Sequence, residues 1–220
     1  MDNSIPAKDI TLYDLETKFN LQFTEDSQFF PEWQVSLSSV TTEEKMFLDI
    51  AKGGYINLIK YPSMLENAVQ LTVLSPLLNL SNLLLPPFHI KTETSIYVSN
   101  SDEDMTIEGR IDVLVLKENL WILVIESKRA ELSLKVGLAQ ILAYMLANPK
   151  PQKPCFGLIT NGGNFIFLKL VQDNDIPTYG VSRGFDLLNP GNDLYHVLSI
   201  LKNIKRWALD DFETNSNKQV

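Results

Sequence analysis

The chain has 220 residues, 45% hydrophobic and 21% charged, with a formal net charge of −8. This composition is typical of a globular protein with one large core, and no apolar run is long enough to span a membrane. The start MDNSIPAKDI lacks a signal-peptide pattern, so we expect a cytoplasmic protein without a membrane partner. A single cysteine, Cys155, excludes an intrachain disulfide. Two histidines far apart in sequence, His89 and His196, leave no Cys/His zinc site.

Charge is distributed unevenly along the chain. Residues 1–50 carry ten acidic and three basic side chains, whereas residues 110–169 carry eight basic and four acidic ones. The overall negative charge argues against nucleic-acid binding, which favours a basic surface. The locally basic segment permits a DNA partner without requiring one, because an uneven partition of charge also arises by chance.

The first part of the chain is predicted to be helical. Residues 11–20 (TLYDLETKFN) suggest a short helix. Residues 41–60 begin with Thr41 and have Glu44 three positions later, which is the capping-box pattern of a helix N-terminus. We therefore expect residues 1–60 to form a helical extension packed on the core of one globular domain.

The rest of the chain alternates strands and helices. In chain order the sequence first predicts a helix over 63–76 that Pro76 ends or kinks, a strand over 89–98 and two strands within 109–129. A helix from Ser133 to about Asn148 follows. The last predicted elements are a hairpin over 155–170, which turns at Asn161, Gly162 and Gly163, and a helix over 192–209. This order indicates an α/β fold with a mixed sheet flanked by helices. Residues 61–210 are the expected core, and residues 211–220 the expected flexible tail.

One predicted hairpin contains charged residues. The stretch GRIDVLVLKENLWILVIESKR, residues 109–129, places Asp112, Glu126 and Lys128 within two apolar strands. An unpaired charge in a buried sheet is costly, so these charges need partners. A turn centred on Asn119 would put Asp112 opposite Glu126, with their Cβ atoms roughly 5 Å apart. A shift of one residue would separate the two carboxylates onto opposite faces.

Two carboxylates at that separation repel each other unless a cation lies between them. Lys128 can compensate part of this charge, and a divalent metal can compensate the rest. Paired oxygen ligands with open coordination positions suit Mg²⁺, which keeps several waters and takes phosphate oxygens as further ligands. A neighbouring ammonium can orient the attacking water or help to deprotonate it. The pattern therefore predicts metal-dependent phosphodiester hydrolysis.

Three segments extend this pattern: GRIDVLV, LVIESKR and QILAYM. In them Asp112 is followed by Glu126-Ser127-Lys128, and then by a helix bearing Gln140 and Tyr144. This arrangement resembles the PD-(D/E)XK nuclease superfamily, and more narrowly the N-terminal nuclease domain of type I restriction enzyme R subunits and their stand-alone relatives. The resemblance covers roughly residues 60 to 170, with an isoleucine in place of the name-giving proline. It implies a restriction-endonuclease-like three-layer core and a DNA endonuclease that hydrolyses phosphodiesters with a metal-activated water.

The resemblance also implies roles for single residues. Asp112 and Glu126 would bind Mg²⁺, with Mn²⁺ as an alternative, and Lys128 would be the catalytic lysine. Gln140 and Tyr144 would help to hold DNA or the active-site geometry. They lie at i and i+4 and so share a helix face, which we expect to be opposite an apolar stripe of Leu138, Ile141, Leu142 and Met145.

Further implied residues surround this set. Glu66 matches an acidic residue that superfamily members commonly add from the first core helix. Arg110 and Arg129 flank the site and are candidates for DNA phosphates. DNA is the expected partner, together with a homodimer contact or other restriction-system subunits. The chain has no G-x-x-x-x-G-K-[ST] sequence, so neither a nucleotide cofactor nor ATP-driven translocation is expected.

Each assignment has a structural alternative. The charged residues of the hairpin could form an ion-pair cluster, although that would leave one carboxylate unneutralised. Glu66 could complete a capping box with Ser63, the Gln140 and Tyr144 face could be solvated, and the arginines could be ordinary surface residues. For the whole chain, the alternatives are a catalytically idle nucleic-acid-binding or protein-interaction module that retains the nuclease fold, and a purely structural domain.

Overall fold

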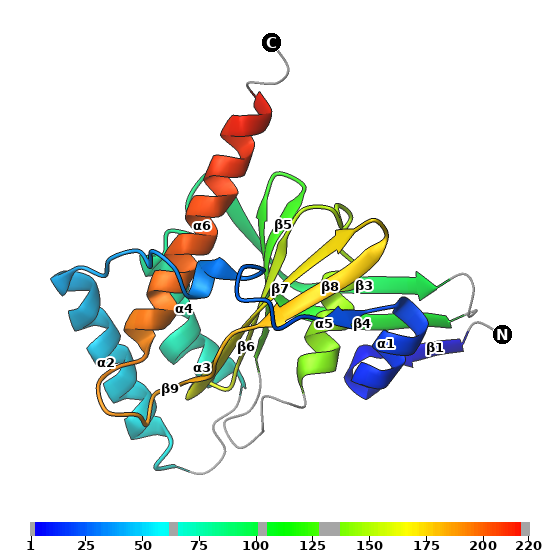
Figure 1. Cartoon of the computed structure of the whole chain (residues 1–220). Coiled ribbons are helices and arrows are strands. Elements are labelled where there is room, and N and C mark those ends of the chain that lie inside the picture. The colour runs from blue at the N-terminus through cyan, green and yellow to red at the C-terminus, as the bar shows by residue number, and fades with distance from the viewer. Residues whose placement is uncertain (1–2, 62–65, 101–104, 128–136, 217–220) are drawn as a thin grey trace.

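The computed structural model of the chain describes residues 3–61, 66–100, 105–127 and 137–216. Within these residues, one mixed sheet is flanked by helices (Figure 1). The predicted α/β class, with a mixed sheet flanked by helices, is therefore confirmed. Lys128 and Arg129 lie outside the described residues.

The sheet contains nine strands within the described part of the chain. In spatial order they are β1 (Asn3–Pro6), β4 (Met105–Lys117), β5 (Leu120–Ser127), β6 (Cys155–Thr160), β7 (Asn164–Asp173), β8 (Ile176–Val181) and β2 (Gln22–Phe23), with β3 (Phe88–Asn100) paired to β4 and β9 (Phe185–Asp186) paired to β7. The β1–β4, β5–β6 and β2–β8 pairs are parallel, and the other pairs are antiparallel. The parallel β5–β6 pair requires a crossover connection, and that connection includes the helix that completes the candidate site.

The helices are α1 (Leu12–Phe19), α2 (Thr42–Leu58), α3 (Glu66–Val69), α4 (Ser75–Leu80), α5 (Leu138–Leu146) and α6 (Leu194–Ser216), with the short 3-10 helices η1 (Ala7–Asp9) and η2 (Pro31–Trp33) and the π-helix η3 (Gln70–Leu74). Helices α1 and α2 begin at the capping boxes of Thr11 and Thr41. The Thr41 hydroxyl accepts a hydrogen bond from the Glu44 backbone, and the Glu44 carboxylate accepts one from the Thr41 backbone. The predicted capping box is therefore confirmed.

Two hydrophobic clusters form on the sheet. One joins the strands to α2, α4 and α6, and the other joins them to α1 and α5 (Figure 1). Alternation along β4 explains the division, because Val113 and Val115 belong to the first cluster, whereas Leu114 and Leu116 belong to the second. Asp112 lies two residues before Leu114 in β4, so its side chain is on the same face, the one that α5 covers. Within the described residues, no helix is long and apolar enough to cross a membrane.

The N-terminal segment differs from the helical extension expected for residues 1–60. It contains α1 and α2, but it also contributes β1 and β2, which pair with β4 and β8 in the sheet. Both strands are parallel to their partners and very short. Their pairing partners are distant in sequence, and a strand this short shows too little alternation to be recognised.

Two helix boundaries also differ from the prediction. Pro76 was expected to end or kink its helix, but it does not end it, because α3, η3 and α4 follow one another without a break and Leu74 and Ser75 are both in helical conformation. The irregularity lies before it, in the π-helix η3. The last helix, α6, continues to Ser216, so residues 211–216 are helical rather than part of a flexible tail.

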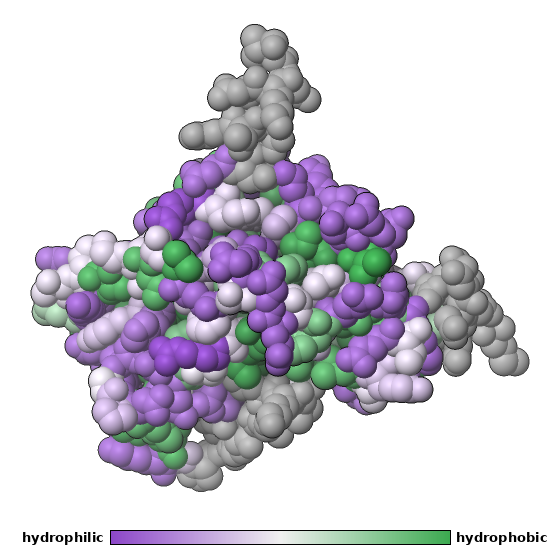
Figure 2. All heavy atoms as spheres, in the orientation of Figure 1, coloured by the Kyte–Doolittle hydropathy of each residue, from purple (hydrophilic) through white to green (hydrophobic). Residues whose placement is uncertain are grey.

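The surface shown in Figure 2 is largely hydrophilic, with apolar side chains in small separate groups. Exposed apolar residues are normal on a protein surface when they are scattered. The described residues of this face therefore form no broad apolar surface.

Candidate functional site

The candidate site lies where the sheet divides. β3 pairs with β4 along nearly its whole length, but the other side of β4 has two successive neighbours. β1 pairs with residues 105–108 of β4, and β5 pairs with residues 113–117. Residues 109–112 lie between these two partners, so this side of β4 is open to side chains from the covering helix. Asp112, half-buried, is the last residue of this opening.

A β-bulge sets the register of β4 and β5. At the turn, Lys117 pairs with Leu120, but the register shifts between Val115 and Leu116, and beyond the shift Val113 pairs with Ile125. An extra residue in β5 reverses which face the following side chains point to. The predicted antiparallel neighbours are therefore confirmed. The turn is centred between Glu118 and Asn119, half a residue before the expected centre at Asn119. The bulge then restores the register that puts Asp112 and Glu126 on one face.

Asp112 is held by the neighbouring strand. Its Oδ2 accepts a hydrogen bond from the Ser127 backbone N–H at 2.7 Å. Ser127 directly follows Glu126 in β5, so this hydrogen bond holds the Asp112 carboxylate beside the backbone that carries Glu126. Hydrogen bonds from backbone amides favour the ionised form of a carboxylate, which is the form that binds a metal.

Helix α5 supplies the partners of Glu126. The Glu126 side chain is buried, and its Oε1 accepts a hydrogen bond from Gln140 Nε2 at 2.8 Å. The same Nε2 donates to Tyr144 Oη at 2.6 Å. Gln140 and Tyr144 therefore point toward Glu126. Both are buried, so the alternative of a solvated helix face is wrong.

The pKa of Tyr144 is affected by both carboxylates. Burial raises the pKa of Tyr144 to about 12, and the negative charges of Glu126 and Asp112 act in the same direction. Hydrogen bonds from Gln140 and from the backbone of Arg110 oppose this rise. An electrostatic effect of both acids on one phenol is consistent with their convergence at this end of α5.

Gly109 explains how Tyr144 fits into the opening of the sheet. A Cβ atom at this position would lie 2.5 Å from Tyr144 Cε1 and 2.8 Å from Ala7 Cβ, closer than carbon atoms can approach. Sequence reasoning did not select Gly109 as a site residue. A glycine within a strand often marks a close approach, and that was the available signal.

The remaining predicted residues have different surroundings. Arg110 is exposed and forms an ion pair with Glu93 of β3. Glu66 is the first residue of α3, and its side chain is outside the described part of the structure. One turn later, Gln70 Nε2 lies 3.4 Å from Ser127 Oγ, so η3 reaches the end of β5. Gln70 was not predicted, although its i+4 spacing from Glu66 was a usable signal.

The carboxylates of the site are oxygen donors of the kind that Mg²⁺ binds. Among the described residues, no group of three or more His, Cys, Asp or Glu side chains could hold a metal. Asp112 and Glu126 provide two carboxylates on adjacent strands. Mg²⁺ is commonly bound by one or two carboxylates, with waters completing its octahedron, so this donor set fits Mg²⁺.

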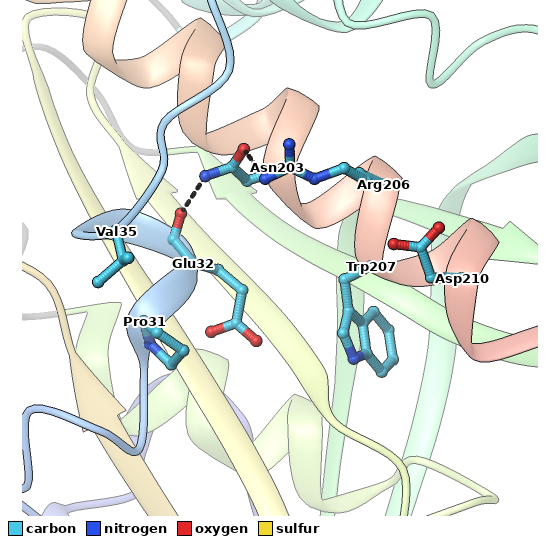
Figure 3. A pocket seen from close by; sticks show the side chains of 7 residues that line it. All are labelled: Pro31, Glu32, Val35, Asn203, Arg206, Trp207 and Asp210. Carbon is cyan, nitrogen blue, oxygen red and sulfur yellow. Dashed lines mark hydrogen bonds between the residues drawn. The ribbon is translucent and has the colours of Figure 1, made fainter.

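A separate hollow lies between η2 and α6 (Figure 3). Its volume is about 380 Å³, and Glu32, Arg206 and Trp207 are among the residues that line it. Glu32 forms an ion pair with Lys169 at 2.7 Å, and Asn203 donates a hydrogen bond to the Glu32 carbonyl. The hollow contains no residue of the predicted site, and the ion pair between Glu32 and Lys169 holds η2 against the sheet.

Comparisons with protein-family models and with curated protein sequences give no significant match. The likeness to PD-(D/E)XK nucleases therefore depends on the residues of this chain and on their arrangement.

We expect Gly109→Ala to lower the free energy of unfolding by about 1–3 kcal/mol, because the new methyl group would displace Tyr144 or Ala7 of η1. Gly53→Ala is the control, since a Cβ there meets no atom within 4 Å and the residue lies in α2. A helical Gly→Ala change should instead stabilise the chain by about 0.5–1 kcal/mol. Urea denaturation measures both values, and a loss of equal size in the two variants would contradict the contact.

We expect Tyr144 to make stability depend on pH only in alkaline solution. Its pKa is higher in the folded chain than its ordinary value, so the phenol ionises first in the unfolded chain, and stability falls as pH rises from 10 to about 12. Below pH 10 the phenol has no effect. Wild type should therefore lose roughly 1–2 kcal/mol relative to Tyr144→Phe across this range. Urea denaturation at several pH values tests this, and a constant difference would mean that Tyr144 titrates normally.

Proposed function

We propose that the chain is a metal-dependent DNA endonuclease of the PD-(D/E)XK type, with the restriction-endonuclease-like three-layer core of that superfamily. The observation that best supports this is the position of Glu126, a buried carboxylate hydrogen-bonded to Gln140, on the strand next to Asp112. Two adjacent strands and one helix thus combine the acidic pair with the Gln and Tyr pattern of type I restriction R-subunit nuclease domains.

Asp112 and Glu126 are the proposed ligands of Mg²⁺, or of Mn²⁺ in its place. The bound metal would lower the pKa of a water and stabilise charge on the scissile phosphate. Gln140 holds Glu126 Oε1, and the Ser127 backbone N–H holds Asp112 Oδ2. The chain therefore orients both carboxylates through fixed donors, which reduces the reorganisation needed when the metal binds.

Lys128 is the proposed group that handles the proton of the attacking water. Its placement is outside the described residues, and the proposal depends on its position directly after Ser127 at the end of β5. An ammonium beside two carboxylates can orient water by hydrogen bonding and help to remove its proton. Glu66, at the start of α3, is the proposed additional acidic residue.

DNA is the proposed substrate. Arg110 lies two positions before Asp112 on β4, and its guanidinium is exposed. Its ion pair with Glu93 is also exposed, so solvent weakens it and a phosphate can replace the carboxylate. Arg129 is proposed for the same role. A homodimer, or association with other restriction-system subunits, would supply the second active site that double-strand cleavage needs.

We expect the chain to cleave supercoiled plasmid DNA with Mg²⁺ or Mn²⁺ and not with EDTA. Asp112→Ala and Lys128→Ala should each reduce the rate by about a hundredfold or more, because each removes stabilisation of the developing charge. Asp173→Ala and Lys150→Ala are matched controls at exposed positions and should cleave like wild type. Absence of metal-dependent cleavage in wild type would favour the catalytically idle module.

We expect divalent metal to stabilise the folded chain by about 2.7 kcal/mol when it is present at a hundred times its dissociation constant. Asp112→Asn should abolish this shift while leaving the apo protein equally stable or more stable, because it removes repulsion with Glu126 and keeps an oxygen acceptor for Ser127. A structural ion-pair cluster predicts the reverse, a loss of roughly 3–5 kcal/mol in the apo protein. Thermal melts of both proteins with and without metal distinguish the two roles.

A further inference from the structure

The end of strand β5 is held from both faces of the sheet. On one face, Gln140 of α5 donates a hydrogen bond to Glu126 Oε1 at 2.8 Å. On the other face, Gln70 Nε2 of η3 lies 3.4 Å from Ser127 Oγ. Successive side chains of a strand point to opposite faces, so two helices contact neighbouring residues of one strand from opposite directions. The first contact belongs to the proposed metal site, whereas the second has no role in the function proposed above.

Ser127 links the Gln70 contact to both carboxylates. Its backbone N–H donates to Asp112 Oδ2 at 2.7 Å, and its peptide bond joins it to Glu126. Ser127 is buried, and its backbone pairs with Thr160 of β6. A movement of Ser127 would therefore displace both the donor that holds Asp112 and the backbone that carries Glu126. Gln70 thus holds a residue on which the positions of both carboxylates depend.

The position of Gln70 is set by the packing of its helix. Val73 and Leu74 of η3 are buried in the core cluster that joins the strands to α2, α4 and α6. Gln70 is half-buried and lines a pocket of about 420 Å³, whose lining also includes Val113 of β4. π-Helical turns occur frequently at functional sites, and this one begins at the residue that reaches Ser127. The core therefore anchors the helix, and the Gln70 side chain has space beside it.

We infer that Gln70 and Ser127 are positioning residues of the metal site. The Gln70 amide holds the Ser127 hydroxyl, and Ser127 in turn fixes Asp112 and Glu126 in the arrangement that binds Mg²⁺. The inference rests on the proposed nuclease function. Loss of a residue that orients metal ligands typically weakens metal binding about 10- to 100-fold. Without the contact, the end of β5 has more conformational freedom in the metal-free protein, and metal binding must remove that freedom.

The test measures the Mn²⁺ affinity of the full chain by isothermal titration calorimetry without DNA, so the readout does not depend on cleavage. Gln70→Met removes the amide and keeps the length of the side chain, and the neighbouring pocket provides space for it. Ser127→Ala removes the hydroxyl and keeps the backbone N–H. Each should weaken Mn²⁺ binding about tenfold, the lower end of the range, because 3.4 Å is long for a hydrogen bond. Urea denaturation shows that each variant is folded.

The double variant distinguishes a shared contact from two separate effects. If Gln70 and Ser127 act as one unit, the variant that carries both substitutions should bind Mn²⁺ about tenfold more weakly than wild type, whereas independent effects would multiply to about a hundredfold. The matched controls are Gln172→Met, at a half-buried strand residue, and Ser199→Ala, which removes a buried hydroxyl that donates to the Tyr195 carbonyl. Both controls should bind Mn²⁺ like wild type.

The outcomes separate this inference from the proposed function. Wild-type affinity in either single variant, a multiplied loss in the double variant, or an equal loss in the controls overturns the positioning role. If wild type in that case still binds Mn²⁺ and cleaves plasmid, only the positioning role has failed. If wild type neither binds Mn²⁺ nor cleaves plasmid, the nuclease proposal has failed together with this inference.

Discussion

The hydrogen bond from Gln140 to Glu126 is the interaction on which the geometry of this region depends. A buried carboxylate is costly without hydrogen-bond donors, so the crossover helix α5 must place an amide over the end of β5. Once Gln140 is in place, Tyr144 lies one turn further along the helix, above the gap between β1 and β5. Gly109 then has to lack a side chain, because the phenol ring occupies that space.

The register of the hairpin is the second requirement, and it follows from a local irregularity. Without the bulge between Val115 and Leu116, the tight turn at Lys117 and Leu120 would put Asp112 and Glu126 on opposite faces. The bulge leaves Ile122 without a pairing partner in β4, and it brings the two carboxylates to the α5 face. The apolar residues of the same strands remain divided between the two clusters, so the site is built without removing side chains from the core.

The hairpin thus presents different chemistry on its two faces. Toward α5 it carries two carboxylates, and toward η3 it borders a pocket whose described lining residues carry no charge. Because Asp112 and Val113 are neighbours in one strand, the relative position of these surfaces is rigid.

Much of this arrangement could be read from the sequence where it depends on local patterns. Alternation and turn residues determined the hairpins, Thr41 and Glu44 determined the start of α2, and the acidic pair was recognisable from its spacing. Other features depend on residues far apart in the chain, and local patterns do not encode them. The sheet positions of β1 and β2, the contact between Gly109 and Tyr144, and that between Gln70 and Ser127 were decided only by tertiary structure, because each requires two distant segments to pack within a few ångströms of one another.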